Sequence, residues 1–256
     1  MVSRMRRFSL ADRTVLLTGA GRGIGRALLE QLVSRGVKRI IVVGRDEARL
    51  RALTAEIPSV EGFAADLSIQ TQLDDLVAFV RRNAADLSVL VNNAGTQLLT
   101  DLVDPEADRH QLGLAKEVAV NFSAPIQIAV ALLPQLLEKQ SAMIVNVTSG
   151  LALAPKQSSP VYCAAKAGLR SFTKALRYQA QARAPHVRIV EALPPLVDTH
   201  MTEGRGRGKI SAGACAAEIV AGMEAGQETI YVGKTKLLRT IQGFSPSLAD
   251  RLMRDG

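Results

Sequence analysis

Short apolar runs alternate with helical segments along most of this 256-residue chain, and this alternation constrains the fold more than any other feature. The runs are continuous and rich in β-branched residues, as in KRIIVV at 38–43, which is typical of strands buried on both faces. Strands separated by helices of this length predict parallel βαβ units. We therefore predict an α/β fold, a Rossmann-like, doubly wound parallel sheet in a three-layer arrangement of helices, sheet and helices. The expected strands are 14–17, 38–43, 60–64, 89–91, 143–147, 187–192 and 229–232, and the expected helices are 24–34, 47–57, 70–83, a long one from about 118 that ends near 139, 162–182 and 212–223.

The composition favours one domain spanning 1–256. Apolar residues make up 47% of the chain, which is enough for a sizeable core, and no low-complexity linker divides it. The two cysteines, Cys163 and Cys215, form no CxxC pair or His/Cys cluster, so neither a disulfide scaffold nor a metal site is expected. A reducing cytoplasm is the simplest setting for such a chain.

Two basic segments lie outside the alternating pattern. We expect residues 1–11 to form a solvated arm and residues 200–211, which contain GRGRGK, to form a flexible loop on the substrate side. The formal net charge of +8 could attract nucleic acid, an anionic membrane or an acidic small molecule. No aromatic residues are interleaved with the arginines, and the apolar stretch 118–137 carries two prolines and several polar residues. We therefore expect neither a nucleic-acid partner nor a membrane span.

The first strand runs into TGAGRGIG at 18–25, which fits the pattern TGxxxGxG. Glycines in such a turn let the backbone bend tightly and approach a pyrophosphate, while the following helix offers N–H donors at the positive end of its dipole. The position after the first strand of a βαβ unit strengthens this interpretation. The predicted phosphate-binding residues are Gly19, Gly21, Arg22, Gly23, Ile24 and Gly25.

The second strand ends at Gly44 and Arg45 without an acidic residue at its end, since Asp46 comes one position too late. An acidic residue there would bind the 2′-hydroxyl of an unmodified ribose, whereas arginine can neutralise a 2′-phosphate. Together with Arg22 in the glycine turn, Arg45 predicts a preference for NADP(H) over NAD(H). The other interpretation of Arg45 is a solvent-facing residue at the start of a helix.

The remaining strand ends also carry polar residues. Asp66 and Leu67 follow the third strand, and NNAG at 92–95 follows the fourth. Paired amides can hold neighbouring backbones apart and bind the adenosine side of a nucleotide, although an ordinary turn explains NNAG equally well. Ser149 ends the fifth strand, and PPLVDT at 194–199 ends the sixth.

YCAAK at 162–166 places Tyr162 and Lys166 four residues apart. On a helix these positions share one face, so the ammonium would lie near the phenol. At about 6 Å and an effective dielectric of about 20, the ammonium would stabilise the tyrosinate by about 2.8 kcal/mol, or about two pKa units. The pair alone is close to a chance event, and its meaning depends on the other motifs.

Taken together, TGAGRGIG, NNAG, Ser149, YCAAK and PPLVDT resemble the short-chain dehydrogenase/reductase family in its single-domain form, over residues from about 12 to 201. The resemblance implies an NAD(P)-dependent oxidoreductase that acts on a carbonyl or secondary alcohol. Its catalytic tetrad would be Asn121, Ser149, Tyr162 and Lys166. With the turn residues, the implied cofactor site comprises Gly19, Gly21, Arg22, Gly23, Ile24, Gly25, Arg45, Asp66, Leu67, Asn92, Asn93, Ala94, Gly95, Tyr162, Lys166, Val197 and Thr199.

The resemblance also implies roles. Tyr162 would donate the proton, Ser149 would bond to the same substrate oxygen, Lys166 would hold the nicotinamide ribose, and Asn121 would organise a water chain. The long helices would pack into a homodimer or homotetramer. The family commonly has glycine where Pro195 stands here, so a backbone donor is missing beside the nicotinamide.

A second interpretation is a catalytically silent NADP(H)-binding sensor or scaffold. Such a protein has no reason to keep the serine, tyrosine and lysine together at the working spacing, and the chain has all three. The sequence therefore favours the enzyme.

Overall fold

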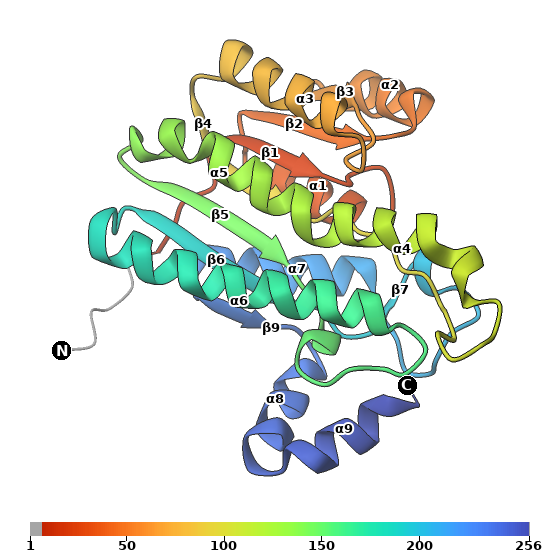
Figure 1. Ribbon diagram of the computed structural model, residues 1–256. Coiled ribbons are helices and arrows are strands. Elements are labelled where there is room, and N and C mark those ends of the chain that lie inside the picture. The colour runs from red at the N-terminus through yellow and green to blue at the C-terminus, as the bar shows by residue number, and fades with distance from the viewer. Residues whose placement is uncertain (1–6, 256) are drawn as a thin grey trace.

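The computed structural model describes residues 7–255 and contains one seven-stranded sheet in the order β3-β2-β1-β4-β5-β6-β9 (Figure 1). Every pairing between neighbouring strands in this sheet is parallel, and the strand order reverses between β1 and β4. The Rossmann-like, doubly wound prediction is thus confirmed. The strands of this sheet are β1 (Thr14–Thr18), β2 (Arg39–Gly44), β3 (Val60–Ala64), β4 (Leu87–Asn92), β5 (Ala142–Val147), β6 (Val187–Leu193) and β9 (Thr229–Tyr231).

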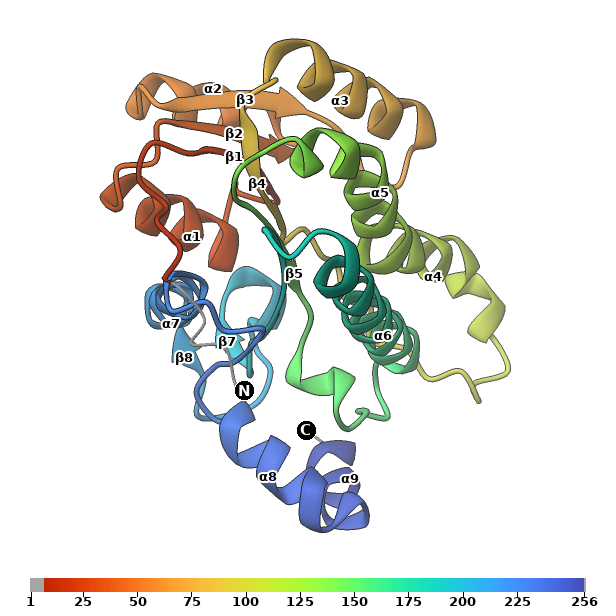
Figure 2. The same ribbon diagram turned by 90° about the vertical axis from the view of Figure 1, so that its left-hand side faces the viewer.

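Helices cover both faces of the sheet (Figure 2). One face carries α1, α2 and α7, whose apolar residues form one core cluster with the strands, and the other carries α3, α5 and α6, which form a second cluster. Because helices cover both sides, β1 and β4 are buried along their whole length, and most of their residues are apolar. These helices are α1 (Gly23–Ser34), α2 (Glu47–Glu56), α3 (Gln70–Asn83), α5 (Ala124–Leu137), α6 (Pro160–Arg183) and α7 (Ala212–Glu224).

The long helix expected from about 118 is longer and less regular than predicted. It begins as α4 (Gln111–Val118), widens into a π-helical turn at Ala119–Ser123 and continues as α5. By length and composition alone, the helix Ala107–Leu137 could cross a membrane, because an 18-residue window within it has a mean hydropathy of 1.5. In this fold, α5 packs against β4, β5 and α3 with its apolar face buried, so the segment serves as a core helix.

Two C-terminal helices, α8 (Thr235–Phe244) and α9 (Pro246–Arg254), were not predicted. They pack against each other at the edge of the molecule beside β9 (Figure 1). Their shared core is small, with only Ala154, Leu238 and Ala249 fully enclosed. The strands and helices at the centre of the fold share far larger apolar clusters.

The N-terminal arm is only partly as expected. Residues 1–6 lie outside the described part of the chain. From Phe8 onward the prediction of a solvated arm is wrong, because Phe8 and Leu10 are buried in the cluster shared by α1 and α7. The Phe8 N–H donates to the Glu224 carbonyl at the end of α7, and the Arg13 guanidinium lies 4.8 Å from the Phe8 ring centroid. The apolar Phe8 and Leu10 side chains therefore extend the core by one further segment.

The segment 200–211 contains more regular structure than a flexible loop. His200–Thr202 forms a 3₁₀ turn, and β8 (Ile210–Ser211) pairs with β7 (Val197–Asp198). Gly204, Gly206 and Gly208 all have positive φ angles, between 58° and 71°, which only glycine adopts readily. The alternating glycines thus allow the tight path that brings β8 beside β7.

Candidate active site

The glycine turn after β1 is packed too closely for side chains. A Cβ atom on Gly19, which has φ +73°, would lie 2.8 Å from the Ala94 Cα, and one on Gly25 would lie 1.9 Å from the Gly19 carbonyl oxygen. Arg22 caps α1 without a side-chain hydrogen bond, and the first turn of the helix has no acidic residue. The positive end of the helix dipole and the first-turn N–H groups therefore suit a phosphate.

NNAG joins β4 to this turn. The Thr18 hydroxyl oxygen accepts hydrogen bonds from the Asn93 and Ala94 N–H groups, each at 3.0 Å. The Asn93 amide donates to the carbonyls of Thr18 and Gly19 at 3.1 and 3.3 Å. Asn93 thus joins the ends of β1 and β4 through hydrogen bonds, whereas the sequence analysis expected the amides to hold neighbouring backbones apart.

Asn92 requires a correction. Its side chain is buried on the other side of the strand and donates to Asn146 Oδ1 at 2.8 Å and to the Pro125 carbonyl at 3.2 Å. Successive residues of a strand point to opposite faces, so two neighbouring asparagines cannot both face one ligand. The Asn92 amide belongs to the packing between β4, β5 and α5.

The end of β2 is basic. Arg45 is 56% exposed at its side chain, and its guanidinium lies 3.9 Å from the Asp66 carboxylate. Asp46 accepts a hydrogen bond from the Arg49 N–H at 3.0 Å as the N-cap of α2, so its carboxylate is engaged at the helix start. Arg49, which the sequence analysis missed, reaches back to the Gly21 carbonyl at 3.5 Å. Arginines therefore flank the glycine turn from α2.

Asp66 is held beside Arg45 by other groups. Lys116 Nζ donates to its carboxylate at 2.7 Å, and the Ser68 hydroxyl and N–H donate at 2.7 and 3.0 Å. Burial opposes ionisation of Asp66, but these bonds prevail and lower its pKa to about 2. The neighbouring Leu67 is buried in the core. Asp66 thus stays ionised at the rim of the site.

The four residues of the implied tetrad come together where β4 and β5 end. The Ser149 side chain lies close enough to the Tyr162 hydroxyl to lower the pKa of the tyrosine, and Ser149 Oγ accepts a hydrogen bond from the Leu151 N–H at 3.1 Å. Lys166 Nζ donates to the Val147 carbonyl at 2.9 Å and lies 5.8 Å from the Tyr162 ring centroid. Tyr162 and Lys166 therefore share one face of α6, as their spacing predicts.

Asn121 reaches the site from the π-helical turn between α4 and α5. It is fully buried, its Nδ2 donates to the Thr96 carbonyl at 2.7 Å, and its Oδ1 accepts from the Thr96 N–H at 3.2 Å. A Cβ atom on Gly95 would lie 3.0 Å from Asn121 Oδ1 and 3.7 Å from Lys166 Nζ. Glycine at 95 therefore lets the β4 loop pass close to both groups.

The sequence analysis expected the Lys166 ammonium to lower the pKa of Tyr162, and this expectation is wrong for the protein without a bound cofactor. Burial raises the pKa of Tyr162 to about 12, although the nearby Ser149 side chain opposes this change. Burial also lowers the pKa of Lys166 to about 8. The sequence argument treated the ammonium as a permanent charge in a moderately polar medium, whereas Lys166 is only 3% exposed and charging it carries a desolvation cost.

The end of β6 closes the site against the glycine turn. A Cβ atom on Gly23 would lie 3.0 Å from the Thr199 methyl group, and Arg22 Nη1 lies 3.4 Å from His200 Nδ1. Val197 is buried in β7, and Thr199 caps the following 3₁₀ turn through Thr202. Thr199 thus lies against the glycine turn, and Val197 stands two residues before it in β7.

A polar chain crosses the side of the site away from the glycine turn. Arg205 donates to Gln97 Oε1 at 3.0 Å, and Gln97 Nε2 donates to the Ser159 hydroxyl at 3.0 Å. It joins the GRGRGK segment, the β4 loop and the start of α6. No local motif marks these three residues, which are far apart in sequence, and the sequence analysis missed them.

Glu117 was missed as well. It is 1% exposed, its Oε1 accepts from the Leu98 N–H at 2.8 Å, and no described residue forms a hydrogen bond with its Oε2. Burial raises its pKa, and its charge would in turn raise the pKa of Tyr162. A glutamate four residues before Asn121 is the only sequence signal for it.

The arrangement fits a dinucleotide. The tightly packed glycines leave a cradle that a Cβ would fill, the α1 N-terminus offers N–H donors, and arginines surround the turn. A phenol, a hydroxyl and an ammonium converge one strand away, where a hydrogen-bonded oxygen could be protonated. This donor set suits a nucleotide beside a proton-transfer centre.

Comparisons with known proteins agree with this geometry. The sequence pattern of short chain dehydrogenases matches residues 13–209. The uncharacterized oxidoreductase DltE of Bacillus subtilis strain 168 is 37% identical over 194 residues, which cover 76% of this chain and 75% of that protein. A short chain dehydrogenase from Burkholderia cenocepacia J2315, solved in complex with NADP, has a TM-score of 0.82 at 25% identity and covers 96% of this chain and 99% of its own. A short chain dehydrogenase/reductase from Burkholderia phymatum, solved in complex with NAD, has a TM-score of 0.81 at 22% identity and covers 96% of this chain and 97% of its own.

Proposed function

The chain belongs to the short-chain dehydrogenase family of NAD(P)-dependent oxidoreductases, and from this membership we propose that it interconverts a carbonyl and a secondary alcohol with NADP(H). The observation that carries the proposal is the convergence of Ser149, Tyr162 and Lys166 beside the glycine turn. The nicotinamide, when bound, supplies or accepts the hydride.

The chain's own residues handle the proton. In the reducing direction, Tyr162 donates its hydroxyl proton to the developing alkoxide, and Ser149 stabilises the same oxygen with a hydrogen bond. Lys166 is mostly protonated at pH 7 because its pKa is about 8, so its charge favours the tyrosinate that remains. Asn121, fixed through Thr96, lies within the same enclosure.

The NADP(H) preference rests on the end of β2. Arg45 stands there exposed, Arg49 lies against the glycine turn, and the carboxylate of Asp46 is engaged as a helix cap. A ribose 2′-phosphate would thus meet positive charge, whereas a free 2′-hydroxyl would find no carboxylate at this strand end. The Burkholderia cenocepacia relative, solved with NADP, supports the proposal, and the Burkholderia phymatum structure shows that the fold also accommodates NAD.

Cofactor binding tests this preference. NADPH and NADH are titrated into the wild type, Arg45→Ala and the control Arg51→Ala, whose arginine points to Glu47 on the outside of α2. Because Arg45 is more than half exposed, its loss should weaken NADPH binding by about tenfold, at the low end for a charge-assisted bond, and leave NADH binding unchanged. Equal affinities for both cofactors in the wild type would refute the preference.

Turnover tests the chemistry. NADPH oxidation is followed with 4-nitrobenzaldehyde, 2,3-butanedione, cyclohexanone and a β-keto ester at saturating cofactor. We expect Tyr162→Phe to bind NADPH as the wild type does and to lose turnover by at least about a hundredfold, since the proton donor is gone. A Tyr162→Phe variant with full turnover would show that another group donates the proton.

Self-association is part of the proposal. The apolar residues Val130 and Tyr178 are exposed on the outer surfaces of α5 and α6, where a second copy could cover them. Light scattering should give the mass of a dimer or tetramer, and a monomer at micromolar concentration would exclude this part of the proposal.

A further inference from the structure

Three consecutive residues at the end of β5 are each linked to helix α6. The Val147 carbonyl accepts a hydrogen bond from Lys166 Nζ at 2.9 Å, and the Ser149 side chain lies near the Tyr162 hydroxyl, whose pKa it lowers. Thr148 lies between them and reaches the same helix through a residue of the neighbouring strand β6.

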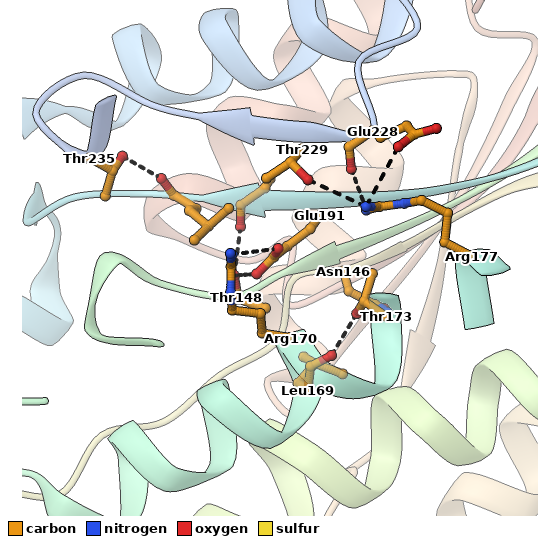
Figure 3. Close-up of polar contacts among 12 residues, drawn as sticks. Asn146, Thr148, Leu169, Arg170, Thr173, Arg177, Glu191, Glu228, Thr229 and Thr235 are labelled. Atoms are coloured by element: carbon orange, nitrogen blue, oxygen red, sulfur yellow. Dashed lines mark hydrogen bonds and ion pairs between the residues drawn. The ribbon is translucent and has the colours of Figure 1, made fainter. Parts of the chain in front are cut away.

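That residue is Glu191, which is 3% exposed. The Thr148 hydroxyl donates to its Oε1 at 2.7 Å, and Arg170 Nη1 donates to its Oε2 at 2.7 Å. Figure 3 shows the Arg170 guanidinium reaching Glu191 from α6, with Thr148 on the neighbouring strand. Both carboxylate oxygens thus have a partner, which a buried charge requires.

Arg170 continues the face of α6 that carries the active-site residues. Tyr162, Lys166 and Arg170 follow one another at intervals of four, so they project from one side of the helix. Burial lowers the pKa of the Arg170 guanidinium, but Glu191 and the side chain of Tyr231 outweigh this effect and raise it. Arg170 is therefore a fixed positive charge, held against β6 by its ion pair with Glu191.

We propose that Arg170, Glu191 and Thr148 form a positioning relay, which holds the end of β5 against α6 so that the Ser149 hydroxyl meets Tyr162 and the substrate oxygen. The relay deepens the proposed function and rests on it. Displacing a catalytic group by about 1 Å can lower the rate by about a hundredfold. A hydrogen bond formed by Thr148, the residue before Ser149, can therefore change kcat through the position of Ser149.

Attachment of α6 to the sheet does not by itself require this relay. About two helix turns further on, Arg177 donates to the Ile189 carbonyl at 2.8 Å and to the Glu228 carbonyl, and Thr229 lies beside it (Figure 3). Those bonds fasten α6 to β6 and β9 without touching β5. The feature specific to Arg170 and Glu191 is the link to Thr148, next to Ser149.

Substitution of Thr148 tests the relay. Thr148→Val keeps the shape and removes the hydroxyl, and Thr148→Ser keeps the hydroxyl. Thr14→Val is a matched control, because Thr14 is also buried and its hydroxyl donates to the Asp86 carboxylate at 2.8 Å, at the opposite end of the sheet. Each variant is compared in kcat for 4-nitrobenzaldehyde, KM for NADPH, urea midpoint and a crystal structure.

We expect Thr148→Val to lower kcat by between about tenfold and about a hundredfold with an unchanged KM for NADPH. In the crystal, the Ser149 and Tyr162 hydroxyl oxygens should lie farther apart than in a wild-type crystal. Thr148→Ser should restore both, and Thr14→Val should lower only the urea midpoint. Glu191→Gln keeps an acceptor for Thr148 and loses the charge beside Arg170. Its kcat should lie between those of Thr148→Val and Thr148→Ser.

Two results overturn the relay. One is a Thr148→Val enzyme whose kcat, relative to the wild type, matches that of Thr14→Val. The other is a Thr148→Val crystal in which the Ser149 and Tyr162 hydroxyl oxygens are no farther apart than in a wild-type crystal. Tyr162→Phe separates the two proposals, because full turnover in that variant rejects the proposed function while the crystal comparison still decides the relay.

Discussion

Replacing Lys166 by methionine should make the protein more stable and inactive at once. Lys166 is almost fully buried, and its one hydrogen bond goes to the Val147 carbonyl. Burial lowers its pKa from 10.5 to about 8, which corresponds to about 3 kcal/mol at about 1.4 kcal/mol per pKa unit. At pH 7 the folded protein therefore carries a desolvation cost that the unfolded chain does not.

The sign follows from proton linkage. Between pH 8 and pH 10.5 the unfolded state binds more protons at Lys166 than the folded state, so this group makes the free energy of unfolding rise with pH. The stability that Lys166 contributes is complete above its unfolded pKa and is lost as the pH falls through its folded pKa. Lys166→Met abolishes this dependence, at a cost of about 1 kcal/mol for the unpaired Val147 carbonyl.

Urea denaturation followed by far-ultraviolet circular dichroism measures the effect. The free energy of unfolding of Lys166→Met should exceed that of the wild type by about 2 kcal/mol at pH 7 and by about zero at pH 9.5. Lys174→Met, at an exposed lysine on the same helix, is the control and should show a difference that does not vary with pH. A constant difference for Lys166→Met would refute the reasoning, and a Lys166→Met enzyme with normal turnover would show that the ammonium has no catalytic role.

Two further substitutions test the site. Gly25→Ala, whose Cβ would lie 1.9 Å from the Gly19 carbonyl oxygen, should abolish NADPH binding in a fluorescence titration, whereas Gly213→Ala, in open space on α7, should leave it unchanged. Retained binding in Gly25→Ala would mean that the turn is not the phosphate site. Glu117→Gln keeps the acceptor for the Leu98 N–H. Because burial raises the pKa of Glu117, the stability that this residue contributes is complete below its ordinary pKa of 4.5 and is lost as the pH rises. The variant should therefore have a higher urea midpoint than the wild type at pH 8 but not at pH 4.5. An equal gain at both pH values would contradict the role of the charge.

Local signals accounted for most of the predicted fold. The continuous apolar runs of β1, β2 and β4 are required by a sheet covered on both faces, so their positions followed from the sequence to within a few residues. The helices α8 and α9 were missed although both are amphipathic; they enclose few residues and leave Leu237 and Phe244 exposed. Their helical periodicity is present in the sequence, but the sequence analysis did not test the C-terminal segment for it.

Local patterns likewise predict some residues of the candidate site and not others. The glycine turn, Ser149 and the pair on α6 have local patterns, because each depends on backbone geometry or on spacing along one element. The relay through Glu191 and the chain through Gln97 join segments that are dozens of residues apart, and no local pattern encodes them.

By itself, the sequence determined the order of strands and helices, the sharp turn after β1 and the shared face of Tyr162 and Lys166, since these depend on periodicity and on backbone freedom within a few residues. The tertiary structure alone decided which asparagine of NNAG faces the site, how deeply Lys166 is buried and which carboxylate holds Thr148. Burial and the distances between remote groups set desolvation and hydrogen bonding, and both arise only when the sheet assembles.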